Sequence, residues 1–153
     1  MKLVRIAKDS FVFQLLKREK WLLHEVLNLY PKIPSNHLRI SKSSKTPDQP
    51  SSQRLLEEAL TEQRSENKTK LEALLSDPAR WSENHTGFQL SLSAAEMEWL
   101  LQVLNDVRVG SWIGLGSPEQ QAQVLNEHTA PHLWAMEIAG AFQMCLLHAL
   151  DKT

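Results

Sequence analysis

The stretch MEWLLQVLNDVRVGSWIGLG, residues 97–116, decides what kind of fold this chain forms. Its apolar residues recur every three or four positions, which is the spacing of a helix, and the glycines at its end stop that helix. One sector of the helical wheel holds Met97, Leu101, Leu104, Trp112 and Leu115. The pattern therefore predicts a buried helix.

Three polar residues interrupt this helix and form the candidate site. Arg108 falls inside the apolar sector and Asn105 at its edge, whereas Asp106 lies nearly opposite and should be exposed. A buried guanidinium keeps its charge and needs an acceptor. Glu137 is the only acid in the apolar segment 133–150. We therefore predict an Arg108–Glu137 pair, fixed further by Asn105, that sets helix register; the alternative is a ligand-binding or catalytic site.

A capping box defines the start of this helix. Ser93 and Glu96 have the spacing at which a hydroxyl and a carboxylate satisfy free N–H groups reciprocally. Leu92 and Met97 are placed as a hydrophobic staple around the cap. The preceding GFQLSLS, residues 87–93, alternates apolar and polar residues and predicts a strand.

The first fifteen residues alternate with a period of two around the turn AKDS. They predict a β-hairpin with strands at about 2–7 and 11–15. A helix is expected next, over 17–30, and Pro31 stops it. The segment HLRIS, residues 37–41, reads as a third short strand.

A polar stretch separates this part from the next helix. Residues 41–52 contain no apolar side chain and predict a flexible linker or loop. From Ser52 a helical stripe of leucines begins, lapses over the polar residues 61–70, and resumes. We favour one long helix over two short ones flanking a loop.

Three later positions carry helix-start signals: Asp77 before Pro78, Ser117 before Pro118, and Thr129 before Pro131. The last of these helices is apolar nearly all round, so it should be the central core helix or lie in a subunit interface. Ala139, Gly140 and Ala141 leave room in it for another helix to approach. The expected fold is one α+β domain over 1–153, mostly α, with an N-terminal hairpin or small antiparallel sheet packed on four to five helices.

Composition bounds the class of protein. A chain of 153 residues with 42% hydrophobic residues can bury a core. The single cysteine, Cys145, excludes a disulfide framework and favours a cytoplasmic protein in which it is a small core residue. No long uninterrupted apolar run or signal-peptide pattern is present, so we expect no membrane span.

The charge is divided unevenly, with about +7 on residues 1–45 and about −8 on the remainder. An anionic partner for the first part is one interpretation, and mutual attraction or simple solvation of the two parts is the other. The basic residues are scattered and show no recognition helix; they are Lys17, Arg18, Lys20, Lys32, Arg39, Lys42 and Lys45. A DNA-associated regulator that uses this basic part stays an alternative.

Evidence for catalysis or a metal is weak. His128 and His132 have the i, i+4 spacing of two zinc ligands, but Pro131 and the cap at Thr129 place His128 outside the helix. Cys145 has His148 three residues on, but an all-apolar helix suits a core cysteine better than a nucleophile. We expect no cofactor, and no catalytic set.

Leu104, Asn105, Asp106 and Arg108, followed by Gly110 and GLG at 114–116, resemble an L-N-D-x-R motif in a bacterial protein family of unknown function. The resemblance extends to the N-terminal hairpin and helix and to the apolar last helix. Trp112 and the Ser/Lys-rich linker depart from it. In some bacteria the family is encoded beside the adaptor of the Clp ATP-dependent protease, and some members are labelled possible transcriptional regulators. The resemblance implies no catalytic residues.

The function expected from these observations is non-enzymatic protein interaction, with another protein or with a second copy. The resemblance adds a connection to regulated proteolysis. The alternatives are the DNA-associated regulator and an enzyme or anionic-ligand binder that uses Asn105, Arg108 and Glu137.

Overall fold

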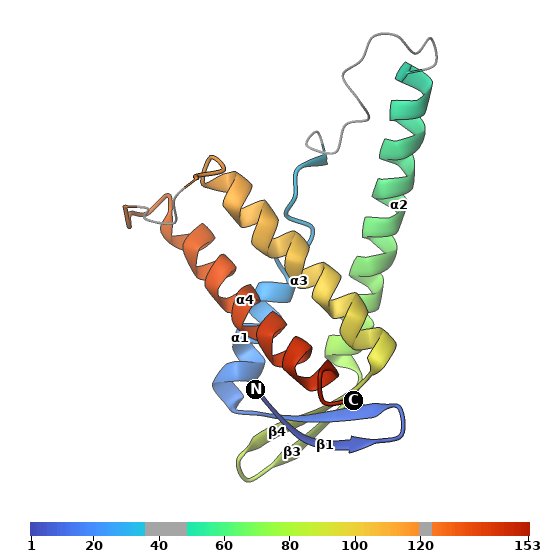
Figure 1. Cartoon of the computed structure of the whole chain (residues 1–153), viewed down its shortest axis with the longest axis vertical. Helices are drawn as coiled ribbons and strands as arrows, with labels where there is room; N and C mark the ends of the chain where they lie inside the picture. Colours follow the sequence, from blue (N-terminus) through green and yellow to red (C-terminus); the bar gives the residue numbers. More distant parts are fainter. Residues whose placement is uncertain (36–48, 120–123) are drawn as a thin grey trace.

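The computed structural model describes residues 1–35, 49–119 and 124–153. Within these ranges the chain forms a four-stranded antiparallel sheet and four helices (Figure 1). Their order is β1 (Lys2–Ala7), β2 (Ser10–Leu15), α1 (Lys17–Leu27), α2 (Gln49–Ser76), β3 (Trp81–Asn84), β4 (Gly87–Ser93), α3 (Ala94–Gly114) and α4 (Ala130–Leu150). The predicted α+β, mostly helical class with a small antiparallel sheet is confirmed, and the described residues form four helices where four to five were expected.

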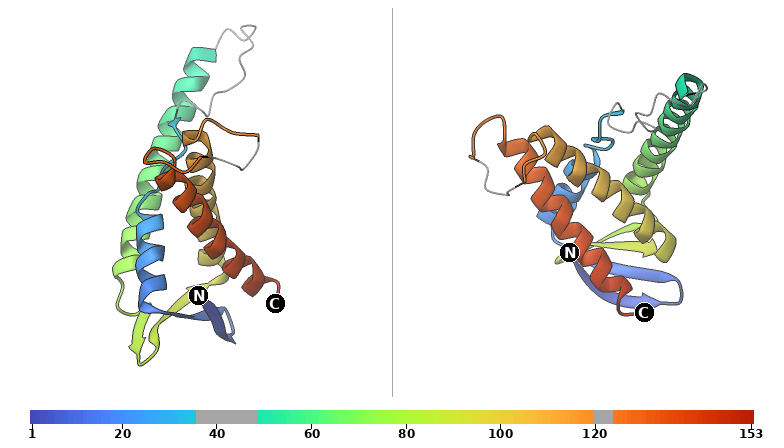
Figure 2. Two further views of the ribbon diagram at one scale, coloured as in Figure 1. Left: turned by 90° about the vertical axis from the view of Figure 1, so that its left-hand side faces the viewer. Right: turned by 45° about the horizontal axis from the view of Figure 1, so that its top comes forward.

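The sheet combines the N-terminal hairpin β1–β2 with the later hairpin β3–β4. Its strand order is β1-β2-β4-β3, and every neighbouring pair is antiparallel. Phe13 on β2 lies opposite Leu90 on β4, and both are fully buried. Because side chains alternate across a strand, these residues share the sheet face that packs under the helices (Figure 2). The alternation read in residues 87–93 thus agrees with the burial of Leu90 and Leu92, whereas the alternating Val4 and Ile6 on β1 are exposed.

The capping box links the sheet to α3 as predicted. The Ser93 hydroxyl accepts from the Glu96 N–H at 3.1 Å, and the Glu96 carboxylate accepts from the Ser93 N–H at 2.8 Å. Glu96 also pairs with Arg80, which fixes the turn before β3 to the start of α3. Leu92 and Met97 are both buried, as a staple requires.

Helices α3 and α4 form an antiparallel pair that lies over the sheet (Figures 1 and 2). The predicted α4 start at Thr129 is confirmed. Only one face of α4 is buried, whereas Met144 is 67% and Leu147 is 47% exposed. Cys145 is half-buried, and its thiol donates to the Met1 carbonyl at 3.4 Å. Helix α4 is therefore not a central core helix surrounded on all sides, because one of its faces is exposed.

Helix α2 rises from the body as one continuous helix, so residues 61–70 are helical as expected (Figure 1). Polar contacts hold its middle. The Asn67 amide donates to the Tyr30 hydroxyl at 2.9 Å and accepts from the Trp99 indole N–H at 3.0 Å. These bonds explain why the polar stretch stays helical without a leucine stripe.

Three boundary predictions need correction. Helix α2 begins at Gln49, so residues 49–52 belong to it rather than to a linker; residues 41–48 and the whole predicted strand at 37–41 lie outside the described residues. Asp77 starts no helix: its carboxylate accepts from the Ala79 N–H at 2.9 Å, and this turn leads into the unpredicted β3. The same Asp-Pro chemistry serves turns and helix starts.

The helix expected from Pro118 is also not formed in the described residues 117–119. Ser117 has a φ of 53°, and its N–H donates to the Trp112 carbonyl at 3.1 Å. The Trp112 indole N–H in turn donates to the Pro118 carbonyl at 3.1 Å. Ser117 and Pro118 thus complete the C-terminus of α3, because free carbonyls at a helix end need donors.

Candidate functional site

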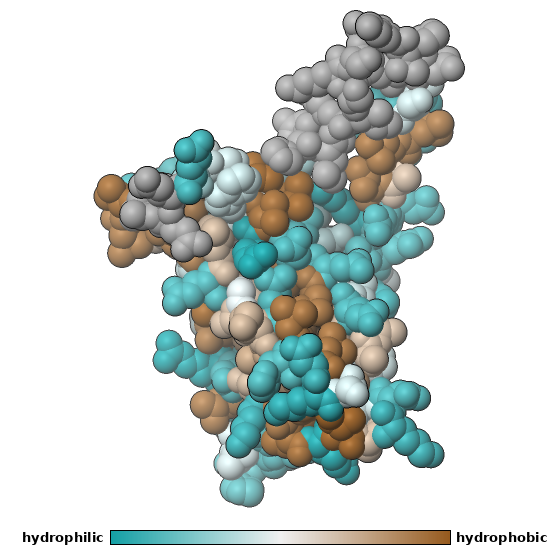
Figure 3. Space-filling view, viewed as in Figure 1, coloured by the Kyte–Doolittle hydropathy of each residue, from teal (hydrophilic) through white to brown (hydrophobic). Residues whose placement is uncertain are grey.

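A groove runs between the C-terminal half of α3 and the N-terminal half of α4, with a volume of about 980 Å³. Its walls are mainly apolar: Val109 and Trp112 on α3, Leu115 directly after it, and Leu133, Met136 and Gly140 on α4. Pro118, Glu119 and Leu125, from the connection between the helices, also line it. Hydrophobic residues reach the surface among hydrophilic ones over these two helices (Figure 3). Trp112 is 37% exposed although it is large and apolar.

Gly140 keeps the α4 wall open. A Cβ atom placed there would meet no heavy atom within 4 Å. The neighbouring Ala139 is fully buried in the core. The small residues at 139–141 therefore have different roles: Ala139 fits into the core, whereas Gly140 faces empty space in the groove.

Arg108 and Glu137 line the same groove, but not as the predicted buried pair. Both residues are exposed, and no ion pair within 4.0 Å joins them. Arg108 instead donates to the Asn105 side-chain oxygen at 3.3 Å, on the exposed surface. The structure thus brings the three predicted residues to one face, and it corrects the prediction that Arg108 points inward.

Of the three polar residues of the predicted site helix, Asn105, Asp106 and Arg108, it is Asp106 that packs against another segment. Its Oδ1 accepts from the Lys32 N–H at 2.6 Å and from the Ile33 N–H at 3.3 Å. The buried face of α3 is centred on Val103 and Val107, so the helix is turned from the predicted orientation. The predicted buried sector was displaced toward the surface because it included apolar residues, above all Trp112, that line the groove instead of the core.

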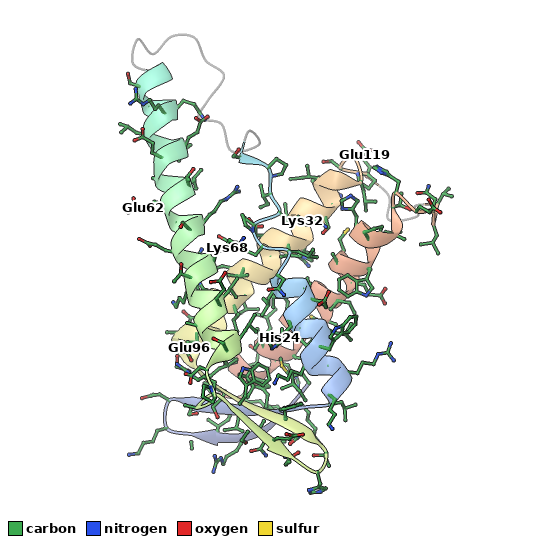
Figure 4. The ribbon with its side chains drawn as sticks, turned by 180° about the vertical axis from the view of Figure 1, so that it is seen from behind. His24, Lys32, Glu62, Lys68, Glu96 and Glu119 are labelled. Carbon is green, nitrogen blue, oxygen red and sulfur yellow. The ribbon has the colours of Figure 1, made fainter. Side chains whose placement is uncertain are left out.

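The segment after α1 crosses the back of α3 at Gly110, beside the labelled Lys32 (Figure 4). A Cβ atom at Gly110 would lie 2.4 Å from the Lys32 carbonyl carbon. The Lys32 ammonium donates to the hydroxyl of the fully buried Ser111 at 2.7 Å, and burial lowers the pKa of Lys32. A glycine inside the helix was the sequence signal for this close approach.

His128 and His132 do come together, with ring centroids 6.1 Å apart in an edge-to-face arrangement. Burial lowers the pKa of His132, and the nearby Lys32 and His128 lower it further. His132 Nδ1 is buried without a hydrogen-bond partner. No group of three or more His, Cys, Asp or Glu side chains in the described part of the chain could hold a metal ion.

The basic residues considered for DNA binding are spread over different surroundings. The Lys20 ammonium lies 3.9 Å from the Phe88 ring centroid and 4.7 Å from that of Trp81. Lys32 is bonded to Ser111, while Arg39, Lys42 and Lys45 lie outside the described residues. Of the described residues in this set, Lys17 and Arg18 are exposed, and the Lys17 ammonium nitrogen lies 3.9 Å from a carboxylate oxygen of Glu83.

No protein-family model, curated protein or solved structure matches this chain. The resemblance carried by Asn105, Asp106 and Arg108 therefore stays an expectation. Among the described helices, α4 alone is long and apolar enough to cross a membrane by length and composition, with 33% of its most apolar window buried.

Proposed function

We propose that this chain is a non-enzymatic protein-interaction domain that binds an apolar helical segment in the α3–α4 groove. The observation that carries the proposal is an open, mainly apolar groove between two helices that are each buried on one face in the core. Exposed apolar surface that is rimmed by charged residues, here Arg108 and Glu137, is typical of protein-interaction sites. Amphipathic helices bind in grooves of this kind through residues three or four positions apart.

Trp112 offers an exposed aromatic ring to a partner, and Gly140 leaves unfilled space in the groove. A half-exposed tryptophan supplies a large contact area, and such residues often dominate the free energy of binding. Gly140 lies on the opposite wall with nothing above it. An incoming helix can therefore place one apolar side chain against Trp112 and another in the space over Gly140.

Site-specific photo-crosslinking tests this function. A photoreactive amino acid at Met136, in the groove, should give a discrete protein adduct in living cells. The same amino acid at Glu62, an exposed position on α2, serves as the control (Figure 4). Adducts at both positions alike, or at neither, would contradict a docking role for the groove.

Two variants at one position sharpen this test. Gly140→Trp should fill the groove and abolish the Met136 adduct, because the space above Gly140 accepts the ring without displacing the core. Gly140→Ala adds only one methyl group and should retain the adduct. Circular dichroism should show equal helicity for both variants.

The other candidate functions have less support. For a DNA-associated regulator, Lys17 and Arg18 are exposed, whereas Lys20 and Lys32 are engaged elsewhere. An enzyme or anionic-ligand site at Asn105, Arg108 and Glu137 would be open to solvent. A link to regulated proteolysis rests on the family resemblance, and the identity of the crosslinked partner tests it.

A further inference from the structure

We propose that the occupant of the α3–α4 groove is the same groove of a second copy of this chain, in a two-fold symmetric dimer. This inference rests on the proposed function and specifies its partner. The dimer axis runs along the groove, so that α3 of each copy packs against α4 of the partner subunit. The positions of Arg108 and Glu137, which are exposed and oppositely charged, favour this arrangement.

The two charges lie at the same height on opposite walls. The Gln143 side chain donates to the Leu101 carbonyl at 3.3 Å, which fixes the register of the antiparallel pair α3 and α4. Arg108 lies seven residues after Leu101 on α3, and Glu137 lies six residues before Gln143 on α4. Equal rise per residue in both helices therefore brings Arg108 and Glu137 nearly level, and both line the groove.

Symmetry determines which charges meet. A two-fold axis parallel to the groove keeps each residue at its height and exchanges the two walls, so Arg108 faces Glu137 of the partner subunit. An axis perpendicular to the helices in the interface plane would bring α3 onto α3 and α4 onto α4, with like charges nearest when it passes at the level of Arg108 and Glu137. Like charges at an interface are costly, whereas each isologous contact occurs twice. Charge complementarity thus favours the axis along the groove.

The apolar residues agree with this arrangement. Trp112 lies about one helical turn from Arg108, and Leu133 about one turn from Glu137, in the same direction along the pair. In the dimer the exposed Trp112 ring therefore packs on Leu133 and Met136 of the partner subunit. Both copies bury their grooves, and the two charge pairs lie at the rim. The result is a four-helix interface of the kind found in helical bundles.

Analytical ultracentrifugation with charge-exchange variants tests the dimer. The unaltered chain should sediment mainly as a dimer once its concentration reaches about 0.1 mM, which corresponds to a weak but specific dissociation constant. Arg108→Glu alone and Glu137→Arg alone should each raise the dimer dissociation constant at least about tenfold, since like charges then face each other. The double variant should return the dissociation constant to within about threefold of the original value, because the pairs form again in reverse.

Controls separate this result from misfolding and from net charge. Arg108 and Glu137 are exposed, so their replacement leaves the core intact. Arg18→Glu makes the same change in net charge as Arg108→Glu, at an exposed position on α1, and should leave the dissociation constant unchanged. Circular dichroism should show the same helical signal for all variants.

The outcomes decide between occupants. A monomer at every concentration overturns the dimer, and a Met136 adduct with a different protein then leaves the proposed function standing. A monomer that floats with phospholipid vesicles and gives no protein adduct overturns both. A dimer that neither charge reversal weakens, or that the double variant does not restore, overturns the axis along the groove.

Discussion

Gly110 lies directly against the main chain of Lys32, so that a Cβ atom at position 110 would stand 2.4 Å from the Lys32 carbonyl carbon and 2.7 Å from the Ile33 nitrogen. These neighbours are backbone atoms, which cannot rotate away as the end of a side chain can. Gly114, the other glycine of α3, is also tightly surrounded, but its neighbour is the His132 ring. The contact at Gly110 therefore fixes the segment after α1 on the back of α3.

Gly110→Ala should destabilise the chain by about 1–3 kcal/mol, because the added methyl group forces the Lys32 backbone away from α3. The matched variant Gly140→Ala should be neutral or stabilising by up to about 1 kcal/mol, since alanine favours a helix and the site is open. Urea unfolding monitored by circular dichroism measures both. Equal effects of the two substitutions would contradict the close approach at Gly110.

Asp106→Ala should lower the free energy of unfolding by about 1–3 kcal/mol, because the Lys32 and Ile33 N–H groups then lose their acceptor. Asp106→Asn keeps an acceptor oxygen and should cost less. Asn105→Ala, one residue away on the exposed surface, serves as the control and should change stability by less than about 0.5 kcal/mol. The three variants can be compared by thermal and urea unfolding.

Asn67→Ala should loosen α2 without unfolding the rest of the chain. The change removes the acceptor of the Trp99 indole N–H and the donor to the Tyr30 hydroxyl. Amide hydrogen exchange should therefore become faster in residues 61–70, while the strands β2 and β4 keep their protection. Thr69→Ala, on the exposed side of the same helix, should leave exchange in α2 nearly unchanged. Uniform acceleration across the sheet would contradict this local role.

Acidification should destabilise the chain as pH falls through 6.5, the usual pKa of histidine. Burial lowers the pKa of His24 and of His132 from the usual value of 6.5, and Lys20 and Lys32 respectively add repulsion. The folded state then binds fewer protons than the unfolded state, so the free energy of unfolding falls as pH drops through 6.5 toward the folded pKa values. Urea unfolding at several pH values measures the slope.

A paired substitution isolates the source of this pH dependence. Replacing His24 and His132 by glutamine should flatten the slope, whereas His85→Gln, at an exposed position, should preserve it. The hydrogen bonds of Glu19 and Glu96 lower the pKa of both carboxyls despite burial, which raises it. Their contribution is lost only as pH falls below about 4.5. A slope unchanged in the double variant would assign the effect to other groups.

Local patterns predicted the elements well wherever the signal lay within a few residues. The Ser93–Glu96 capping box, the N-terminal hairpin and the α4 start at Thr129 depend on neighbours in sequence, and the structure has all three. Asp77 and Ser117 misled because the same residue types also serve turns and helix ends. Short-range chemistry specifies that the chain changes direction, but not always which element comes next.

The candidate site depended more on tertiary packing. Asn105, Arg108 and Glu137 were found from their unusual places in apolar helices, and they do lie on one face of the molecule. The direction of Arg108 was wrong because α3 is apolar over a wide arc, and a wheel cannot tell which apolar residues face the core and which face a groove. Trp112 lies on the groove side.

By itself, the sequence determined the α+β composition, the capped start of α3 and the apolar character of α4, since these follow from periodicity and from hydrogen-bonding groups close in the chain. Only the tertiary structure decided that Asp106 rather than Arg108 faces inward, that α2 is held through Tyr30 and Trp99, and that a groove remains open above Gly140. Each of these depends on residues from distant segments meeting with a particular helix rotation. Burial of the largest apolar area, combined with satisfied backbone groups, selects that rotation, and no local pattern contains it.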